Sequence, residues 1–147
     1  AADIVIAVEH ARFGLPEPLI GVAALAGGLH RLPRQIGMKR AMGLLLSGDS
    51  IDARTALAWG LVNEVASAAE FDAVIAAWLA KLLRAAPLSL RATKDCVRDG
   101  LDLTLEAAIR RQDADGYPAL NTLRRSHDVL EGIAAFSEKR PPRWQGR

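Results

Sequence analysis

The stretch Phe13–Gly21 reads FGLPEPLIG and holds one carboxylate, Glu17, between two prolines. The prolines fix the backbone φ on both sides and remove backbone donors, which predicts a stiff, non-helical segment. Its other side chains are mostly apolar, and poor solvation disfavours the charged form of a carboxyl group. Such an acid can exchange protons near neutral pH, as acid–base catalysis requires. A solvated Glu17 on a surface loop is the alternative interpretation of these residues.

The composition indicates a globular chain. Its 147 residues suit one domain, with 50% apolar and 24% charged residues. A single cysteine, Cys96, cannot form an internal disulfide, which favours a reducing, cytoplasmic setting. No apolar run is long enough for a bilayer, so we expect no membrane partner.

Nucleic acid and metal partners are not expected either. The net charge is only +2, and the 5% of aromatic residues form no stripe interleaved with basic ones. The late arginines are typical of solvated helix faces. The three histidines, His10, His30 and His127, lack metal-ligand spacing.

The first 65 residues predict a small α/β part. Strands are expected over 4–8 and 61–65, with a short extended piece over 11–14. Helices are expected from Leu29 to Gly37, over 39–46 and over 53–59, the last capped by Asp52. Pro33 fits a helix only in its first turn. Because two short strands do not make a stable sheet, we expect partner strands upstream of Ala1 or on another chain.

The remaining residues predict a helical tail. Helices are expected over 69–84 and from Pro87 to about Val97. Thr104 should cap a third helix, which Pro118 ends or kinks, and Ser126 should start a last helix that ends near Lys139. Apolar stripes on these helices indicate packing surfaces.

The chain resembles the enoyl-CoA hydratase/isomerase, or crotonase, family along nearly its whole length. The similarity is carried by the segments ADIVIA at 2–7, FGLPE at 13–17, Gly27-Gly28, SG at 47–48, GLV at 60–62, Ala86-Pro87 and EKRP at 138–141. The resemblance implies an α/β crotonase-like (ClpP/crotonase) spiral fold. Residues 1–65 would be an incomplete part of its β-β-α core, and residues 66–147 a helical C-terminal region for trimerisation and coenzyme A contact. Because family members are nearly twice as long, we expect this chain to be the C-terminal portion of one.

The resemblance also implies a chemistry. The family binds coenzyme A thioesters and stabilises an enolate with two backbone amides, which its N-terminal half supplies together with a first catalytic glutamate. Glu17 matches the second glutamate, which protonates the α-carbon or helps to hold the water. Coenzyme A is part of the substrate, so no separate cofactor is expected. Glu9 and Glu64 match no catalytic position and are assigned to the surface.

The resemblance places substrate-binding residues in both parts of the chain: Pro16, Leu25, Gly27, Phe136 and Lys139. Where hydratases often carry Pro-Gly-Ala, this chain has Ala24-Leu25-Ala26. We expect a free amide at Leu25 and a side chain that crowds the acyl pocket. Phe136 and Lys139, three residues apart on a helix, would share a face towards the nucleotide end of coenzyme A. A core phenylalanine beside a solvated lysine is the alternative.

The predicted function is therefore that of an enoyl-CoA hydratase portion, inactive without the N-terminal half and assembled as a homotrimer or dimer of trimers. An enoyl-CoA isomerase or a carnitinyl-CoA-type dehydratase is the alternative within the family. A non-catalytic oligomerisation module is the alternative of another class. The acyl group and the stereochemistry stay open.

Overall fold

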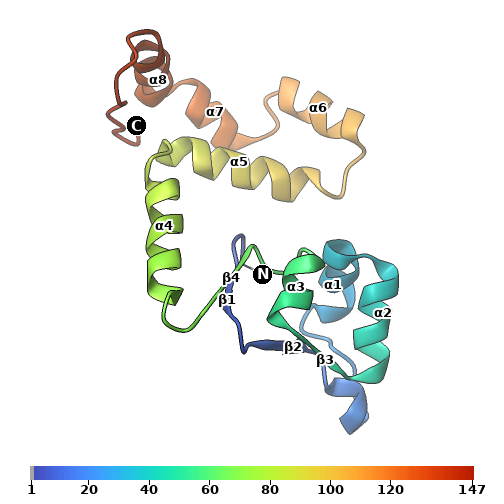
Figure 1. The fold of residues 1–147 in the computed structure, drawn as a ribbon. Coiled ribbons are helices and arrows are strands. Elements are labelled where there is room, and N and C mark those ends of the chain that lie inside the picture. Colours follow the sequence, from blue (N-terminus) through green and yellow to red (C-terminus); the bar gives the residue numbers. More distant parts are fainter. Residues whose placement is uncertain (1) are drawn as a thin grey trace. The chain divides into compact units, whose positions relative to one another are not determined.

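The computed structural model describes residues 2–147 (Figure 1). The chain divides into two compact units, Ala1–Trp78 and Leu79–Arg147. The predicted division at residue 65 stays a prediction, because compactness alone does not identify which residues belong to a spiral core.

The first unit holds four short strands in two pairs. β1 (Ile6–Val8) runs parallel to β4 (Glu64–Ala66), and β2 (Arg12–Gly14) runs antiparallel to β3 (Ser50–Asp52). β1 lies inside its predicted range, whereas β4 begins three residues later than expected. β3 was not predicted, because three residues, two of them polar, give too short a pattern to show the period of a strand.

The helices of the first unit begin and end close to the predicted residues. They are α1 (Gly28–Ile36), α2 (Met38–Ser47) and α3 (Ala53–Ala58), followed by α4 (Phe71–Leu83), which crosses the boundary between units. The 3-10 helix η1 (Glu17–Ile20) was not predicted. Asp52 caps α3 as predicted, since its Oδ1 accepts a hydrogen bond from the Thr55 amide at 2.7 Å. The expectation that Pro33 lies in a first turn is wrong: it is the sixth residue of α1. The helix tolerates it because only three residues follow, and the Pro33 carbonyl still accepts from Gly37 at 3.1 Å.

Two groups of buried apolar residues form the core of the first unit. One lies between β1 and α3, and the other lies between α1 and α2. Ile51 and Leu61 pack against both groups, so the β2–β3 pair and the turn after α3 connect them. The buried members are Ala7, Ala53, Ala56 and Val62 in the first group, and Leu32, Ile36, Ala41 and Leu44 in the second.

The second unit is helical, as predicted. It contains α5 (Pro87–Gly100), α6 (Leu105–Asp113), α7 (Pro118–Arg124) and α8 (His127–Ser137), with α5 in contact with α6 and α7, and α7 in contact with α8. Thr104 and Ser126 cap α6 and α8 through hydrogen bonds from the amides of Ala107 and Val129. Pro118 does not end α6, which stops at Asp113. It starts α7 instead, because a proline at the first helical position needs no donor and already has a helical φ.

Among the described residues, no single helix is long and apolar enough to cross a membrane. Only α4 and α5 taken together, across a sharp bend, reach the length and composition of a span.

Candidate active site

Glu17 is the first residue of η1, with Pro16 as the N-cap and Pro18 inside the first turn. The prediction of a non-helical segment is therefore wrong in detail: proline φ values suit the start of a tight helical turn. Amide bonds from Leu19 to the Pro16 carbonyl, at 3.0 Å, and from Val22 to the Glu17 carbonyl, at 3.1 Å, close this turn. The proline pair thus still fixes the backbone that carries the carboxylate.

One oxygen of the Glu17 side chain has no partner. The side chain is half-buried, and Oε2 is buried without a hydrogen bond among the described residues. Buried polar atoms in folded proteins are nearly always bonded, and an orphan costs free energy unless a water or a ligand satisfies it. Glu17 Oε2 is therefore available to accept a hydrogen bond from a water or a ligand.

A cavity of about 450 Å³ adjoins Glu17. This volume is in the range of sites that take small ligands. One part of the wall is apolar and includes Phe13, Leu15, Leu32, Leu44 and Leu61. The polar part comes from Arg12, Glu17, Arg31 and Gln35, so Glu17 is the only carboxylate among the described residues of the wall. The Arg12 guanidinium is already bonded to Ser50, through its Oγ at 2.9 Å and its carbonyl at 3.1 Å.

The glycine pair brings the loop before α1 against this wall. A Cβ on Gly28 would lie 2.8 Å from the Ala24 Cβ and 3.3 Å from Leu15 Cδ1, so a side chain does not fit there. Gly27 has a φ of 95°, which favours glycine over residues with a side chain. Both glycines line the cavity together with Glu17.

Two of the predicted binding residues lie elsewhere. Leu25 is 80% exposed and is not among the residues that line the cavity, so the expected crowding of the acyl pocket is not observed. Its amide was expected to be free but donates to the Ala23 carbonyl at 2.7 Å. Pro16 is exposed and lies outside the lining as well. Of these predicted residues, the structure brings only Gly27 and Glu17 to one cavity.

Phe136 and Lys139 belong to the second unit. Phe136 lies on α8 and is 88% exposed, so the alternative of a core phenylalanine is wrong. Lys139 does not share a helix face with it, because α8 ends at Ser137 and Lys139 has a φ of 54°. The Lys139 amide instead donates to the Phe136 carbonyl at 3.3 Å in the turn that ends the helix.

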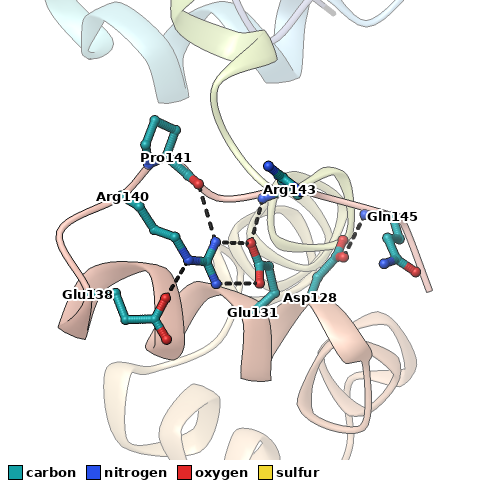
Figure 2. Close-up of polar contacts among 7 residues, drawn as sticks. All are labelled: Asp128, Glu131, Glu138, Arg140, Pro141, Arg143 and Gln145. Carbon is teal, nitrogen blue, oxygen red and sulfur yellow. Dashed lines mark hydrogen bonds and ion pairs between the residues drawn. The ribbon is translucent and has the colours of Figure 1, made fainter.

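Next to this pair, two carboxylates of α8 hold the C-terminal segment, an arrangement that the sequence analysis missed (Figure 2). Asp128, only 2% exposed, accepts from the amides of Gln145 at 2.7 Å and Gly146 at 2.9 Å. Glu131 accepts two bonds from the Arg140 guanidinium, at 2.7 and 3.0 Å, and one from the Arg143 amide at 2.7 Å. We call Asp128, Glu131, Arg140 and residues 143–146 the tail clamp. In the sequence, the one sign of the tail clamp is the pair of opposite charges at Glu131 and Arg140, nine residues apart. Its other bonds come from backbone amides, which a sequence does not reveal.

The tail clamp shifts the pKa of two of its charged members. The bonds from Arg140 and from the Arg143 amide lower the pKa of Glu131 to about 2. The bonds to Glu131 and Glu138 raise the pKa of Arg140 above its usual range. Both groups are therefore charged at any ordinary pH.

The other carboxylates of the α/β part differ from each other. Glu9 is exposed, as predicted. Glu64 is half-buried and accepts from Trp78 Nε1 at 2.6 Å, so it is partly covered and paired, unlike Glu9. Within residues 2–147, no group of three His, Cys, Asp or Glu side chains has the geometry of a metal site.

Comparison with known proteins gives consistent results. The family model described as "Enoyl-CoA hydratase/isomerase" matches residues 1–147. Among curated relatives, a protein named carnitinyl-CoA dehydratase from Salmonella arizonae is 36% identical over 149 residues, which cover 99% of this chain and 56% of the relative. The protein of that name from Proteus mirabilis is 33% identical over 147 residues, with 100% and 56% covered.

Solved structures agree with this. The enoyl-CoA hydratase from Bacillus anthracis matches with a TM-score of 0.90 and 32% identity, over 99% of this chain and 55% of that one. The enoyl-CoA hydratase from Mycobacterium tuberculosis gives a TM-score of 0.90 and 34% identity, over 99% and 56%. These likenesses confirm the predicted α/β crotonase-like fold. The chain spans just over half the length of the proteins that it matches.

Proposed function

Because this chain belongs to the enoyl-CoA hydratase/isomerase family, we propose that it supplies Glu17 to the hydration of a 2-enoyl-CoA thioester or to the reverse dehydration. The observation that supports this proposal is the buried, unpartnered Oε2 of Glu17 beside a cavity of about 450 Å³. An oxygen without a partner among residues 2–147 is free to bond the water that is added or the α-carbon proton.

The chemical role follows from the reaction. Hydration creates negative charge on the thioester oxygen, and removing one donor to such an oxygen typically raises the barrier by about 3 to 4 kcal/mol. In the proposal, the two backbone donors and the first glutamate come from the half of the relatives that this chain does not match. Glu17 then handles one proton, and residues 1–147 turn over no substrate by themselves.

The remaining parts of the proposal concern binding and assembly. Gly27 lets the loop before α1 approach the acyl group, while Phe136 and Lys139 contact the nucleotide end of coenzyme A. Coenzyme A arrives with the substrate, so no separate cofactor is needed. The active form is a homotrimer or a dimer of trimers in the cytoplasm.

Dehydration of carnitinyl-CoA is a second candidate, favoured by the printed names of the curated relatives. Isomerisation of an enoyl-CoA differs in chemistry, because a single carboxylate can move the proton without adding water. A purely structural role of the helical unit in oligomer formation is the alternative without catalysis.

A chimera tests these candidates. The half of the Salmonella arizonae relative that this chain does not match would be joined to residues 1–147 and assayed with crotonyl-CoA, a 3-enoyl-CoA and carnitinyl-CoA. Glu17→Gln removes the proposed acid, and Glu9→Gln is the matched control, since Glu9 is an exposed carboxylate of the same unit.

We expect the chimera and its Glu9→Gln variant to hydrate crotonyl-CoA or dehydrate carnitinyl-CoA, and Glu17→Gln to lose this activity. Turnover of the 3-enoyl-CoA alone would replace the proposal with isomerase chemistry. A folded, trimeric chimera without any turnover would favour the structural role.

A further inference from the structure

Lys139 has an uncommon backbone conformation. With a φ of 54° it is one of two described residues other than glycine that have a positive φ, the other being Asp115. It follows Glu138, the C-cap of α8, in the turn where the Arg140 amide donates to the Ala135 carbonyl at 3.0 Å. Helices that end in this way usually carry glycine here, because a side chain makes the left-handed conformation costly. Such a residue persists only where its surroundings hold it, and it raises the question of function.

The surroundings of Lys139 suit a nucleotide. Phe136 is the most exposed large apolar side chain in the part of the chain that the structure describes, at 88%. The Lys139 side chain is exposed too, and its ammonium takes part in no ion pair among residues 2–147. An exposed ring can stack on a base, and an exposed ammonium can contact a phosphate.

The two chain neighbours of Lys139, Glu138 and Arg140, are bonded to each other through the Arg140 guanidinium (Figure 2). Arg140 Nε donates to Glu138 Oε2 at 2.5 Å, while its two terminal nitrogens donate to Glu131 at 2.7 and 3.0 Å. Glu138 precedes Lys139 and Arg140 follows it, so these bonds bracket Lys139 and fix it to α8. The fork of Arg140 matches the two oxygens of Glu131, which a lysine could not reproduce.

We propose that Glu131 and Arg140 are positioning residues that hold Lys139 in the left-handed conformation and so present its ammonium to the phosphate groups of coenzyme A. This inference rests on the function proposed above and adds to it two residues that do not touch the substrate. Lysine is present at a position that favours glycine because its charge is used in binding.

The test measures binding and local structure separately in the 147-residue chain. The probes are coenzyme A and the adenosine bisphosphate that forms its nucleotide end, titrated by calorimetry. Hydrogen exchange of the Arg140 amide reports the helix-ending turn, and the melting temperature reports the fold. The variants are Glu131→Gln, Arg140→Lys, Lys139→Gly and Lys139→Arg. Glu106→Gln, which removes the surface ion pair of Glu106 with Arg110 in the same unit, is the matched control.

The four variants have distinct expected results. Lys139→Gly should raise the melting temperature, because it relieves the backbone, yet weaken both probes about fivefold, as expected for the loss of one exposed charge contact. Lys139→Arg should keep the affinity. Glu131→Gln and Arg140→Lys should speed exchange of the Arg140 amide and weaken both probes, although Lys139 itself is unchanged. Glu106→Gln should alter neither measurement.

Two results would overturn the inference, and they differ. If Glu131→Gln speeds amide exchange but binds both probes as tightly as Glu106→Gln does, the tail clamp is only structural while the nucleotide contact stands. If Lys139→Gly binds as tightly as the unchanged chain, or if that chain binds neither probe, the proposed contact of Lys139 with the nucleotide is itself wrong.

Discussion

Glu17 and Glu131 are both half-buried glutamates, but they differ in how many hydrogen bonds their carboxylates accept. The carboxylate oxygens of Glu131 accept three hydrogen bonds within the chain, two from Arg140 and one from the Arg143 amide. Glu17 lies at a cavity with a buried oxygen that bonds nothing among the described residues. The Glu131 carboxylate contributes to the fold, whereas the Glu17 carboxylate has an oxygen free to bond a ligand.

The difference shows how a structural carboxylate can be told from a candidate catalytic one. Both glutamates have apolar neighbours in the sequence, so residue type does not separate them. What separates them is the supply of donors, because a satisfied carboxylate has no free lone pair directed at a ligand. The contrast predicts that changes near Glu17 affect chemistry most, and that changes near Glu131 affect stability most.

Glu17→Gln should have the largest effect. In the chimera, kcat should fall about 10²- to 10⁴-fold, the usual contribution of a positioned acid or base. The free energy of unfolding should change little, because Oε2 makes no hydrogen bond among the described residues that the variant could lose. Steady-state assays and urea unfolding measure the two quantities. A loss of stability that matches the loss of activity would contradict the comparison.

Asp128→Ala should have the largest effect on stability. It leaves the amides of Gln145 and Gly146 without their acceptor and should lower the free energy of unfolding by about 2 to 3 kcal/mol. Asp128→Asn keeps one acceptor oxygen and should cost less. Urea unfolding of the 147-residue chain measures both. Equal costs would mean that neither the packing of the side chain nor one acceptor oxygen is enough, and that the full carboxylate is required.

Gly28→Ala should damage the region of Glu17 without removing a charge. The added methyl would lie 2.8 Å from the Ala24 Cβ, so the loop must shift at a cost of about 1 to 2 kcal/mol. Activity of the chimera should fall by more than this cost implies, because the shifted loop lines the cavity. Gly43→Ala is the control: nothing lies within 4 Å of its added Cβ, and it should be neutral or stabilising.

Ser126→Ala removes the cap of α8, the helix that carries Asp128 and Glu131. We expect a loss of about 1 kcal/mol and faster hydrogen exchange of the Arg143 amide. Thr104→Ala removes the cap of α6 at a similar cost but should leave that exchange rate unchanged. If both variants speed the exchange equally, the tail clamp does not depend on the start of α8.

Lowering the pH should have the smallest effect, because water screens Glu131 in part. Its pKa is lowered from 4.5 to about 2 in the folded chain, so its contribution is complete above pH 4.5 and is lost as the pH falls towards 2. The stability difference between the unchanged chain and Glu131→Gln should therefore shrink over this range. Urea unfolding at several pH values tests this, and a constant difference down to pH 2 would show that the charge is not what matters.

Much of the fold was predictable from local rules. The caps Asp52, Thr104 and Ser126 are confirmed, because a short polar side chain before an apolar periodic run has few other roles. Prolines were less predictable, since Pro118 starts a helix and Pro33 lies inside one. A proline restricts its own backbone φ, but this restriction does not indicate whether the helix precedes or follows the proline.

The candidate site was predictable only where backbone geometry fixes it. The prolines predicted a stiff segment around Glu17, and the family resemblance placed Gly27 near the substrate; Glu17 and Gly27 line one cavity. The amide of Leu25 and the tail clamp were not predictable, because both depend on which backbone donor meets which acceptor in three dimensions. The orphan oxygen of Glu17 likewise appears only when its surroundings are known.

The parallel pairing of β1 with β4 has a consequence for how the chain folds. Val5 donates to Asn63 Oδ1 across 58 residues, and Asn63 donates back to the Val5 carbonyl at 2.7 Å. Closing so long a loop costs entropy before any contact repays it, whereas the helix pairs of the second unit form over short separations. We expect the helical unit to form first on the folding pathway. Pulsed hydrogen exchange during refolding should protect amides of α5 and α7 before those of β1 and β4, and the reverse order would refute this.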